Sequence, residues 1–203
     1  MTMACLDLEG ILIPEIWIGL AEITGISELR LTTRDIADYD ELMTMRLNIL
    51  RKHQLTFKDI EEVTNNMQPL EGALDFLVWL KQRTEVIILS DTFREFAKPL
   101  MAKLQFPTLL CHSLIINKEH QIENYCLRQQ DQKRNAIKAF KNLNFRVIAI
   151  GDSYNDLSML LEANEAFFFR PTQKITEEYP DIPVCKNYDE LKLILCQNTG
   201  FTQ

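Results

Sequence analysis

Acidic residues follow two apolar runs that lie far apart in this chain of 203 residues. Asp7 and Glu9 come directly after the first run, and Asp152 and Asp156 come after residues 147–150. In an open parallel sheet, ligands bind just beyond the carboxyl ends of the strands, so the two groups can meet at one site. Carboxylates gathered there repel one another unless a hard cation joins them, and clusters of oxygen ligands suit Mg²⁺. The sequence therefore predicts metal-assisted chemistry at one edge of an α/β sheet.

The spacing of Asp7 and Glu9 fits a nucleophile followed by a proton carrier. An aspartate at a strand end can attack a phosphoryl group and form an aspartyl-phosphate, which divides one difficult step into two. A carboxylate two residues later can give a proton to the leaving oxygen and then take one from the attacking water. Taken alone, however, the pair is better described as a turn whose acids cap the next segment.

The segment from Gly151 to Asp156 is more informative. Gly151 would let the backbone approach a ligand closely, and Asp152 and Asp156 are expected on one face of the first helical turn. Acids at the start of a helix also interact favourably with its dipole, so capping is the alternative interpretation. The pairing with Asp7 at another strand end favours a functional site.

A third strand end carries Ser90 and Asp91. A hydroxyl group and backbone N–H groups at this place can hold phosphoryl oxygens, much as helix N-termini bind anions. Lys133, which opens a later helix, can neutralise charge that builds on a transferring phosphoryl group. Seen singly, Ser90 with Asp91 is more typical of a helix N-cap, and a lone lysine is more typical of a solvated surface.

Strands and helices alternate over most of the chain, and this pattern predicts an α/β fold with a doubly wound, Rossmann-like parallel sheet. Apolar runs predict strands at 3–8, 85–89, 108–110, 146–150 and 166–169, and a hairpin formed by 113–116 and 121–127. Helical spacing predicts helices at 70–82, 93–104, 133–143, 156–163 and 173–179, and from 188 onward.

Residues 14 to about 66 interrupt this alternation. Pro14 suits the start of a helix, Gly25 suits a C-terminal cap, and further helices are expected from about residue 40 and from Thr56. The expected organisation is a catalytic α/β core made of residues 1–13 and 69–203, with a helical cap at 14–68 inserted after the first strand.

The composition argues against several other classes of protein. The net charge is −7, the pI is about 5.1 and no basic run stands out, so no nucleic-acid partner is expected. No apolar run approaches the length of a membrane span, so no membrane association is expected. The five cysteines form no C-x-x-C pair, which fits reduced thiols and a cytoplasmic location.

Four motifs, taken together and in this order, resemble those of the haloacid dehalogenase superfamily of phosphotransferases. They are Asp7-Leu8-Glu9, Ser90, Lys133 and the segment Gly151–Asp156. The resemblance covers essentially the whole chain, and the joint pattern is specific although each part is weak.

The resemblance implies a role for each motif residue. Asp7 would be the nucleophile, Glu9 the acid and base, and Ser90 and Lys133 would bind phosphoryl oxygens. A Mg²⁺ ion would be held by Asp7, Asp152 and the backbone carbonyl of Glu9. The remaining residues would take supporting roles, with Asp91 and Asn155 on the substrate side and Asp156 behind the metal ligands.

Within the superfamily, the inserted helices resemble the cap of phosphoserine phosphatases, in which a glutamate binds the substrate ammonium and an arginine its carboxylate. Glu15 and Arg46 match these positions, and the planar fork of Arg46 suits a carboxylate bidentately. The alternatives are an acid at a helix start and a surface charge. The stretches 4–10, 14–18, 88–93 and 151–156 most resemble a bacterial branch that acts both as phosphoserine phosphatase and as phosphoserine:homoserine phosphotransferase. This resemblance implies O-phospho-L-serine and L-homoserine as small-molecule substrates.

Two residues depart from the general pattern, since Glu9 stands where most members have Asp and Ile11 stands where Thr is common. A longer acid that is held differently would favour transfer to a bound alcohol over proton delivery to water. Three other functions stay open: a phosphatase for another small phosphate ester, a non-catalytic binding module, and an NAD-type nucleotide-binding protein. The last lacks a G-x-G-x-x-G after the first strand. The sequence leaves the oligomeric state open.

Overall fold

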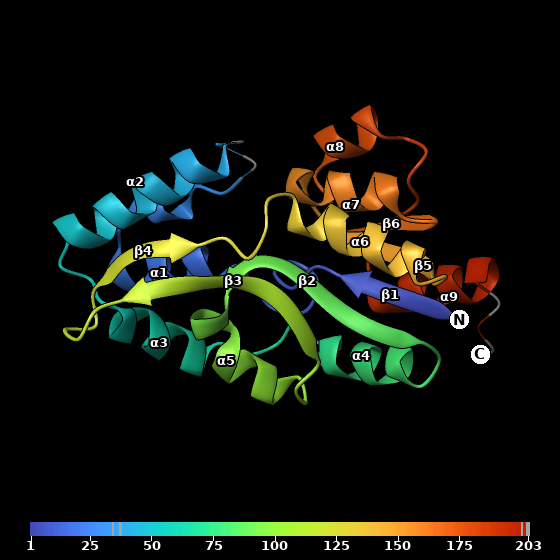
Figure 1. The fold of residues 1–203 in the computed structure, drawn as a ribbon, viewed down its shortest axis with the longest axis horizontal. Helices are drawn as coiled ribbons and strands as arrows, with labels where there is room; N and C mark the ends of the chain where they lie inside the picture. The colour runs from blue at the N-terminus through green and yellow to red at the C-terminus, as the bar shows by residue number, and fades with distance from the viewer. Residues whose placement is uncertain (34, 37, 200, 202–203) are drawn as a thin grey trace.

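The computed structural model describes every residue except 34, 37, 200 and 202–203. Within the described chain, the centre is a seven-stranded sheet in the order β4-β3-β2-β1-β5-β6-β7, in which β4 runs antiparallel and the other neighbours run parallel (Figure 1). The strands are β1 (Thr2–Leu6), β2 (Glu85–Phe93), β3 (Thr108–Ile116), β4 (Ile122–Cys126), β5 (Arg146–Gly151), β6 (Glu165–Phe169) and β7 (Val184–Cys185). Parallel strands joined through helices confirm the predicted doubly wound α/β class.

Both faces of the sheet are buried, because successive side chains of a strand point to opposite faces. In β1, Ala4 and Leu6 belong to one hydrophobic cluster and Cys5 belongs to another. The first cluster includes residues of α4 (Ala73–Lys81), α5 (Arg94–Lys103) and α9 (Tyr188–Thr199). The second includes residues of α6 (Gln132–Asn142), α7 (Leu157–Glu162) and α8 (Gln173–Glu178). Figure 1 shows α4 and α5 below the sheet and α6 and α7 above it.

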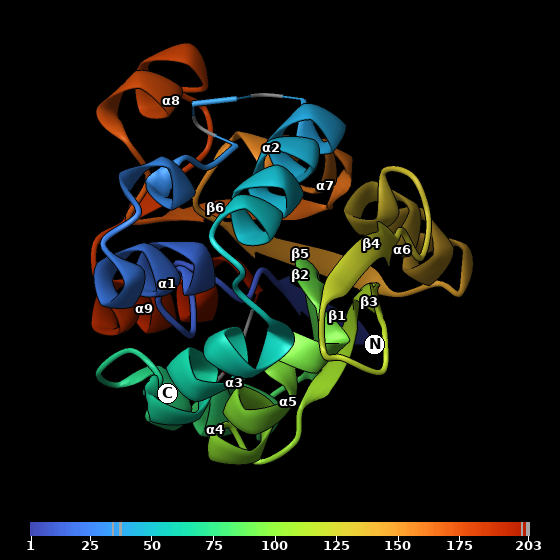
Figure 2. The same cartoon turned by 90° about the vertical axis from the view of Figure 1, so that its left-hand side faces the viewer.

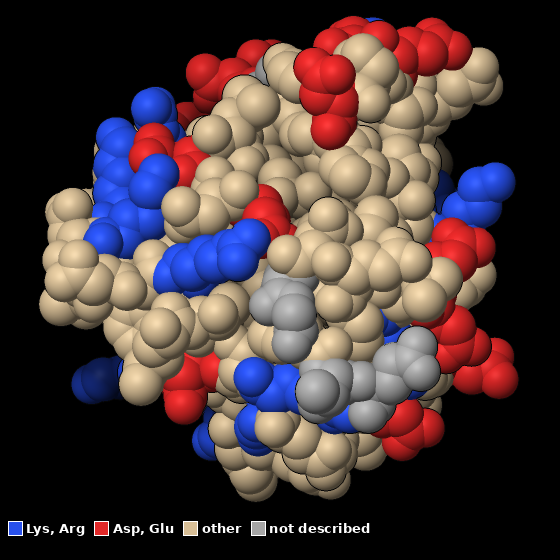
Figure 3. All heavy atoms as spheres, turned by 90° about the vertical axis from the view of Figure 1, so that its right-hand side faces the viewer, with Lys and Arg blue, Asp and Glu red and all other residues tan. Residues whose placement is uncertain are grey.

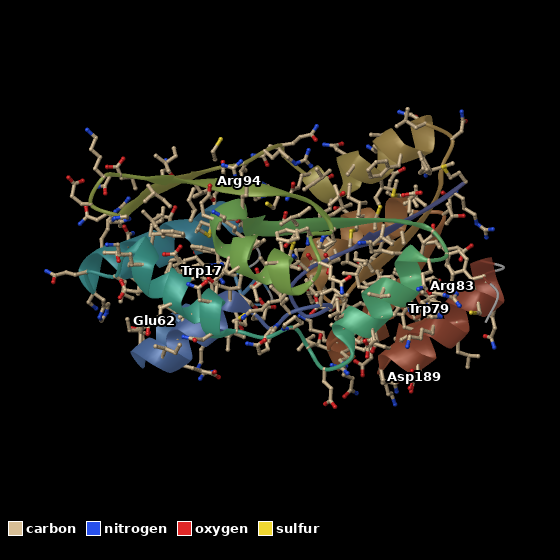
Figure 4. The ribbon with its side chains drawn as sticks, turned by 90° about the horizontal axis from the view of Figure 1, so that it is seen from below. Trp17, Glu62, Trp79, Arg83, Arg94 and Asp189 are labelled. Atoms are coloured by element: carbon tan, nitrogen blue, oxygen red, sulfur yellow. The ribbon has the colours of Figure 1, made fainter. Side chains whose placement is uncertain are left out.

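The predicted cap is helical and lies at one end of the sheet. Between β1 and α4 the chain forms α1 (Ile16–Thr24), a 3₁₀ turn (Ser27–Arg30), α2 (Tyr39–Lys52) and α3 (Phe57–Asn66). Figure 2 looks onto this end. In this view α3 lies beside α5, and α1 and α2 lie above them. The rings of Trp17 and Phe96 meet edge to face with centroids 5.7 Å apart, which joins α1 to α5. Figure 4 accordingly shows Trp17 among the cap helices, far from Trp79 and Arg83.

The two linkers that lead into and out of the cap lie side by side. The backbone N–H of Leu70 donates to the carbonyl oxygen of Leu12 at 2.9 Å. Leu8, Ile11, Leu12 and Ile13 are fully buried in the entering linker. The chain therefore enters and leaves the cap at the same place on the core.

The β3–β4 hairpin extends from the sheet to the cap. Arg51 Nη2, near the end of α2, donates to the carbonyl oxygen of Glu123 at 2.8 Å, and the Phe57 N–H donates to that of His120 at 2.8 Å. The predicted strand at 108–110 and the first hairpin arm prove to be one continuous strand. The second arm pairs with its outer half, so β3 is partly sheet and partly hairpin.

The remaining differences from the predicted elements are small. Helix α4 begins at Ala73 rather than at residue 70, because Gly72 has a left-handed backbone (φ 80°) that cannot continue a helix. Strand β2 continues to Phe93, where a helix start was predicted, and β7 was not predicted.

On the face shown in Figure 3, side chains of both charges are interspersed with uncharged ones. The described residues include no helix long and apolar enough to cross a membrane.

Candidate active site

Three neighbouring strands bring the predicted site residues to one edge of the sheet. Asp7 follows β1 directly, Ser90 and Asp91 lie in the last part of β2, and Asp152 follows β5. Because β2, β1 and β5 are adjacent and parallel, their carboxyl ends point to the same place. The structure thus brings together residues that lie far apart in the sequence.

Lys133 is the central cation of this edge. It lies at the start of α6 with 2 % of its surface exposed, and its Nζ is 2.8 Å from Asp156 Oδ1, 3.1 Å from Asp7 Oδ1 and 3.3 Å from Asp91 Oδ2. Burial by itself lowers the pKa of Lys133, but the three carboxylates outweigh it and hold that pKa well above its ordinary value. Lys133 is therefore a fixed positive charge and not a solvated surface residue.

The carboxylates that gather here fit a hard divalent cation. Oxygens of Asp7, Asp152 and Asp156 lie within 4.8 Å of one another, and all three residues are buried. Among the described residues, Asp7 Oδ1 finds no hydrogen-bond donor in suitable geometry, although Lys133 is close. Burial and then the charge of Asp156 raise the pKa of Asp7 well above its ordinary value. A cation bound between these oxygens would offset this repulsion, and oxygen ligands suit Mg²⁺.

Asp156 holds the loop that carries Asp152. One carboxylate oxygen of Asp156 accepts the backbone N–H groups of Asp152 (2.9 Å) and Ser153 (3.2 Å), and the other accepts from Lys133. Gly151 makes room for this side chain rather than for a ligand, since a Cβ at Gly151 would lie 2.4 Å from Asp156 Cβ. Gly10, with φ +77°, does the same for Asp152, whose Oδ2 would lie 2.4 Å from an added Cβ. In both loops the glycine leaves space that a carboxylate side chain fills.

Glu9 lies between the core and the cap. Its Oε2 accepts the backbone N–H of Ile16, the first residue of α1, at 2.9 Å. The capping interpretation thus describes Glu9 in this structure, because the carboxylate satisfies an N–H at the start of the next helix. Its role in proton transfer stays a prediction.

A small cavity of about 60 Å³ separates the sheet edge from the cap. Its lining includes Asp7, Ser90, Glu15 and Arg46, together with Tyr39 from the start of α2. Arg46 is 6 % exposed, so the interpretation as a surface charge is wrong. Burial lowers the pKa of Arg46 to about 10. Glu9, Tyr39 and Glu15 act in the other direction and raise that pKa, but burial outweighs them. The cavity therefore joins the predicted nucleophile to the predicted amino-acid contacts.

The guanidinium of Arg46 is held in place but incompletely hydrogen-bonded. It lies over the Trp17 ring, 4.5 Å from its centroid, and its Nη2 donates to the Leu31 carbonyl oxygen at 2.9 Å. Its Nε is buried and has no hydrogen-bond partner among the described residues. A buried donor of this kind calls for an acceptor, which a ligand can supply.

Comparisons with known proteins identify the family of this chain. Residues 17–161 match the family model of the haloacid dehalogenase-like hydrolases. The chain belongs to this family. It is also 54% identical over 192 residues to the phosphoserine phosphatase ThrH of Pseudomonas aeruginosa, covering 95% of this chain and 94% of that protein. A phosphoserine phosphatase of Pseudomonas syringae is 54% identical over 190 residues, covering 94% of this chain and 80% of that protein.

Solved structures of other proteins share the fold of this chain. A phospho-aspartyl intermediate analogue of a phosphoserine phosphatase superposes with a TM-score of 0.75 at 20% identity, covering 96% of this chain and 97% of that one. A phosphoserine phosphohydrolase-like protein from Francisella tularensis gives a TM-score of 0.77 at 20% identity, covering 96% and 100%. These likenesses extend over the cap as well as the sheet.

Three residues of this haloacid dehalogenase-like site were not predicted from the sequence. Tyr39 Oη donates to the backbone carbonyl of Asp91 at 2.8 Å, and His112 and Gln132 lie against the Asp91 side chain. Gln132 directly precedes Lys133, which is the one sequence signal for it. His112 lies within β3, and nothing in its sequence surroundings sets it apart.

The close packing of Gly151 against the Asp156 side chain leads to a stability prediction. We expect Gly151→Ala to lower the free energy of unfolding by about 1–3 kcal/mol, because the new methyl group overlaps Asp156. Turnover should fall with it, since Asp156 would have to move from Lys133. Chemical denaturation and steady-state kinetics measure the two effects.

Gly25→Ala is the matched control for this prediction. Nothing lies within 4 Å of a Cβ at Gly25, whose φ is +70°. That variant should lose about 1 kcal/mol through its left-handed backbone alone and keep its turnover. Full stability and full turnover of Gly151→Ala would contradict the described packing.

Proposed function

We propose that this protein is a Mg²⁺-dependent phosphoserine phosphatase that forms an aspartyl-phosphate on Asp7. The observation that carries the proposal is the small cavity with Asp7 and Ser90 on the core side and Glu15 and Arg46 on the cap side. One part of the cavity suits a phosphoryl group and the other suits an α-amino and an α-carboxyl group. The names of the two relatives that share 54% identity support the same substrate.

The proposed reaction begins with attack of an Asp7 carboxylate oxygen on phosphorus. The ester P–O bond breaks, and the leaving serine oxygen takes a proton from Glu9. The ammonium group of Lys133 and the Ser90 hydroxyl bind the phosphoryl oxygens. Asn155 and Asp91 line the small cavity together with Ser90. In the second half, Glu9 accepts a proton from the incoming hydroxyl, which attacks phosphorus and releases Asp7.

Asp7, Asp152 and the backbone carbonyl of Glu9 would hold Mg²⁺, with Asp156 supporting Asp152 through the loop. When bound, this ion neutralises charge on the phosphoryl oxygens. Asp156 has Lys133 on one oxygen and two amides on the other, so a supporting position suits it better than direct ligation.

The cap residues would select O-phospho-L-serine. Glu15 would accept from the substrate ammonium, and the Arg46 fork would bind the carboxylate. The buried Nε of Arg46, which lacks a partner among the described residues, would gain one in the complex. Stacking over Trp17 limits the rotamers of Arg46 in advance, which reduces the entropy lost on binding.

The acceptor that releases Asp7 would be water or the hydroxyl group of L-homoserine. An in-line displacement puts the incoming oxygen where the serine oxygen left, so an acceptor amino acid would use the same Glu15 and Arg46 contacts. Glu9 accepts a hydrogen bond from the Ile16 N–H, and this contact supports the proposal because it places the proton carrier beside the cap. Incubation with phosphoserine, Mg²⁺ and homoserine, following serine, free phosphate and phosphohomoserine together, tests both activities.

A decisive test of the substrate is the replacement of Arg46. We expect Arg46→Ala to cost about 2–4 kcal/mol in kcat/KM for phosphoserine, because the bound carboxylate loses its bidentate partner. Turnover of p-nitrophenyl phosphate should fall far less, since that ester has neither carboxylate nor ammonium. Use of homoserine as an acceptor should fall along with phosphoserine.

Lys52→Ala is a suitable control for this experiment, because Lys52 lies on the same helix but is exposed. It should leave the ratio of the two substrates unchanged. Equal losses for phosphoserine and p-nitrophenyl phosphate in Arg46→Ala would indicate a damaged cap and would remove Arg46 from the substrate site. In that case a panel of other small phosphate esters would identify the substrate.

A further inference from the structure

The half-buried Asp91 side chain lies at the centre of a hydrogen-bond network whose partners His112, Gln132 and Lys133 are buried. Its Oδ1 accepts from Gln132 Nε2 at 3.0 Å and lies 3.5 Å from His112 Nε2. Its Oδ2 lies 3.3 Å from Lys133 Nζ and 3.4 Å from Asn155 Nδ2. Gln132 and Lys133, which are adjacent on the first turn of α6, therefore bind the two oxygens of one carboxylate. This arrangement ties the start of α6 to the end of β2.

Hydrogen bonds from Arg128 orient the His112 and Gln132 side chains toward Asp91. The backbone N–H of Arg128 donates to His112 Nδ1 at 3.1 Å, which assigns the ring proton to Nε2, 3.5 Å from Asp91 Oδ1 and 3.3 Å from Gln132 Nε2. Arg128 Nε donates to Gln132 Oε1 at 3.0 Å, so the amide nitrogen of Gln132 faces the other way. A flipped amide would bring its oxygen against two acceptors, the carbonyl of Ser90 and the Asp91 carboxylate.

The same amide also holds the loop that carries Ser90. Gln132 Nε2 donates to the Ser90 carbonyl oxygen at 2.6 Å as well as to Asp91. The backbone of Ser90 and the ammonium group of Lys133 are thereby connected through the side chains of Gln132 and Asp91. Burial raises the pKa of Asp91, but Lys133 and the hydrogen bonds from His112 and Gln132 outweigh it and bring that pKa below its ordinary value. Asp91 thus remains an anion that can hold Lys133.

We propose that Asp91, Gln132 and His112 form a positioning clamp that fixes Lys133 relative to Ser90 around the transferring phosphoryl group. Lysine has a flexible four-carbon stem, so contacts from several sides are needed to keep its charge at one point. Groups that are already in position accelerate a reaction because no reorganisation is needed when charge develops. The clamp rests on the proposed function only in taking Ser90 and Lys133 as phosphoryl-binding residues. It assigns Asp91 to positioning instead of direct contact with the substrate.

The first test compares Gln132→Ala with Gln129→Ala in the Mg²⁺-loaded enzyme. Gln129 lies three residues before Gln132 in the chain and is exposed, whereas Gln132 is 2 % exposed. We expect Gln132→Ala to lower kcat about 10- to 100-fold, as for a displaced catalytic group, and Gln129→Ala to have no effect. The loss should be the same for phosphoserine and p-nitrophenyl phosphate, because both carry the phosphoryl group that the clamp serves. A loss confined to phosphoserine would overturn the proposal.

The second test asks whether the clamp residues act through Asp91. In an Asp91→Ala background, His112→Phe should change kcat by less than about threefold, because residues of one network are not additive. Gln132→Ala should lose less there than in the wild-type protein and keep only the part of its effect that comes from its contact with the Ser90 carbonyl. His112→Phe keeps the aromatic contacts with Tyr39 and Phe93 but removes the donor. His112→Gln supplies a new donor and should recover part of the rate. Full losses in the Asp91→Ala background would overturn the proposal.

Thermal unfolding of every variant separates positioning from folding. A lower Tm with unchanged kcat for both esters would show a merely structural role and would also overturn the proposal. If Gln132→Ala does not fold, the pair His112→Phe and His112→Gln decides the question. If phosphoserine proves not to be the substrate, p-nitrophenyl phosphate still tests the clamp, so failure of the proposed function and failure of the clamp remain distinguishable.

Discussion

Replacement of Asp7 by Asn is expected to abolish phosphoserine turnover while the protein stays folded. An amide is not a nucleophile toward phosphorus, so the covalent route is lost, at a cost of at least about a thousandfold in rate, or about 4 kcal/mol. Folding should not suffer, because Asn is nearly isosteric and the buried charge of Asp7 is opposed by the charges of Asp156, Asp152 and Asp91. Steady-state kinetics and thermal unfolding measure the two effects.

Acid quenching with labelled phosphoserine gives an independent measurement for this variant. The wild-type protein should retain labelled phosphate, and Asp7→Asn should retain none. Asp75→Asn is the matched control, since Asp75 is an exposed aspartate in the first turn of α4, away from the site. A folded Asp7→Asn variant with most of its activity would show that another residue is the nucleophile.

Removal of the metal is expected to have an effect of similar size. Treatment with a chelator should abolish activity, and added Mg²⁺ should restore it, because a cation would offset the repulsion between the gathered carboxylates and the phosphoryl group. Asp152→Asn should raise the Mg²⁺ concentration required for activity or remove activity altogether. The physical reason is that Asn offers a neutral oxygen in place of a charged one.

Thermal unfolding provides a measurement of metal binding that does not depend on activity. A ligand that binds only the folded protein raises its stability by an amount that grows with ligand concentration. Mg²⁺ should therefore raise the Tm of the wild-type protein and raise that of Asp152→Asn less. Full activity in excess chelator, or equal Tm shifts in both proteins, would contradict a metal held by Asp152.

Much of the fold was predictable because its signals are local. The strands of the sheet are continuous apolar runs, since both faces are buried, and the helices between them repeat at helical spacing. The continuity of β3 was not predictable, because Cys111 and His112 separate its two apolar stretches, and pairing with β4 holds its outer half. The two-residue strand β7 depends wholly on β6 beside it.

The candidate site was predictable as a set of residues but not as an arrangement. Asp7 and Asp152 could be placed together because strand ends share one edge of the sheet. The burial of Arg46 depends on Trp17 from another helix, and the reason for Gly151 is the Asp156 side chain that folds back against it. His112 and Gln132 gain their roles only when β3 and α6 meet at Asp91. Such contacts are tertiary, so no spacing along the chain reveals them.

The hydrogen bond between Leu70 and Leu12 has a consequence for how such a protein can diversify. A segment whose two ends already touch can be lengthened, shortened or exchanged without disturbing the strands on either side. The residues that would recognise an amino acid, Glu15 and Arg46, lie inside this segment, whereas Asp7, Lys133 and Asp152 lie outside it. With the proposed roles, the chain would separate the choice of substrate from the bond-breaking machinery, and an exchanged insert could redirect the same chemistry to a different phosphate ester.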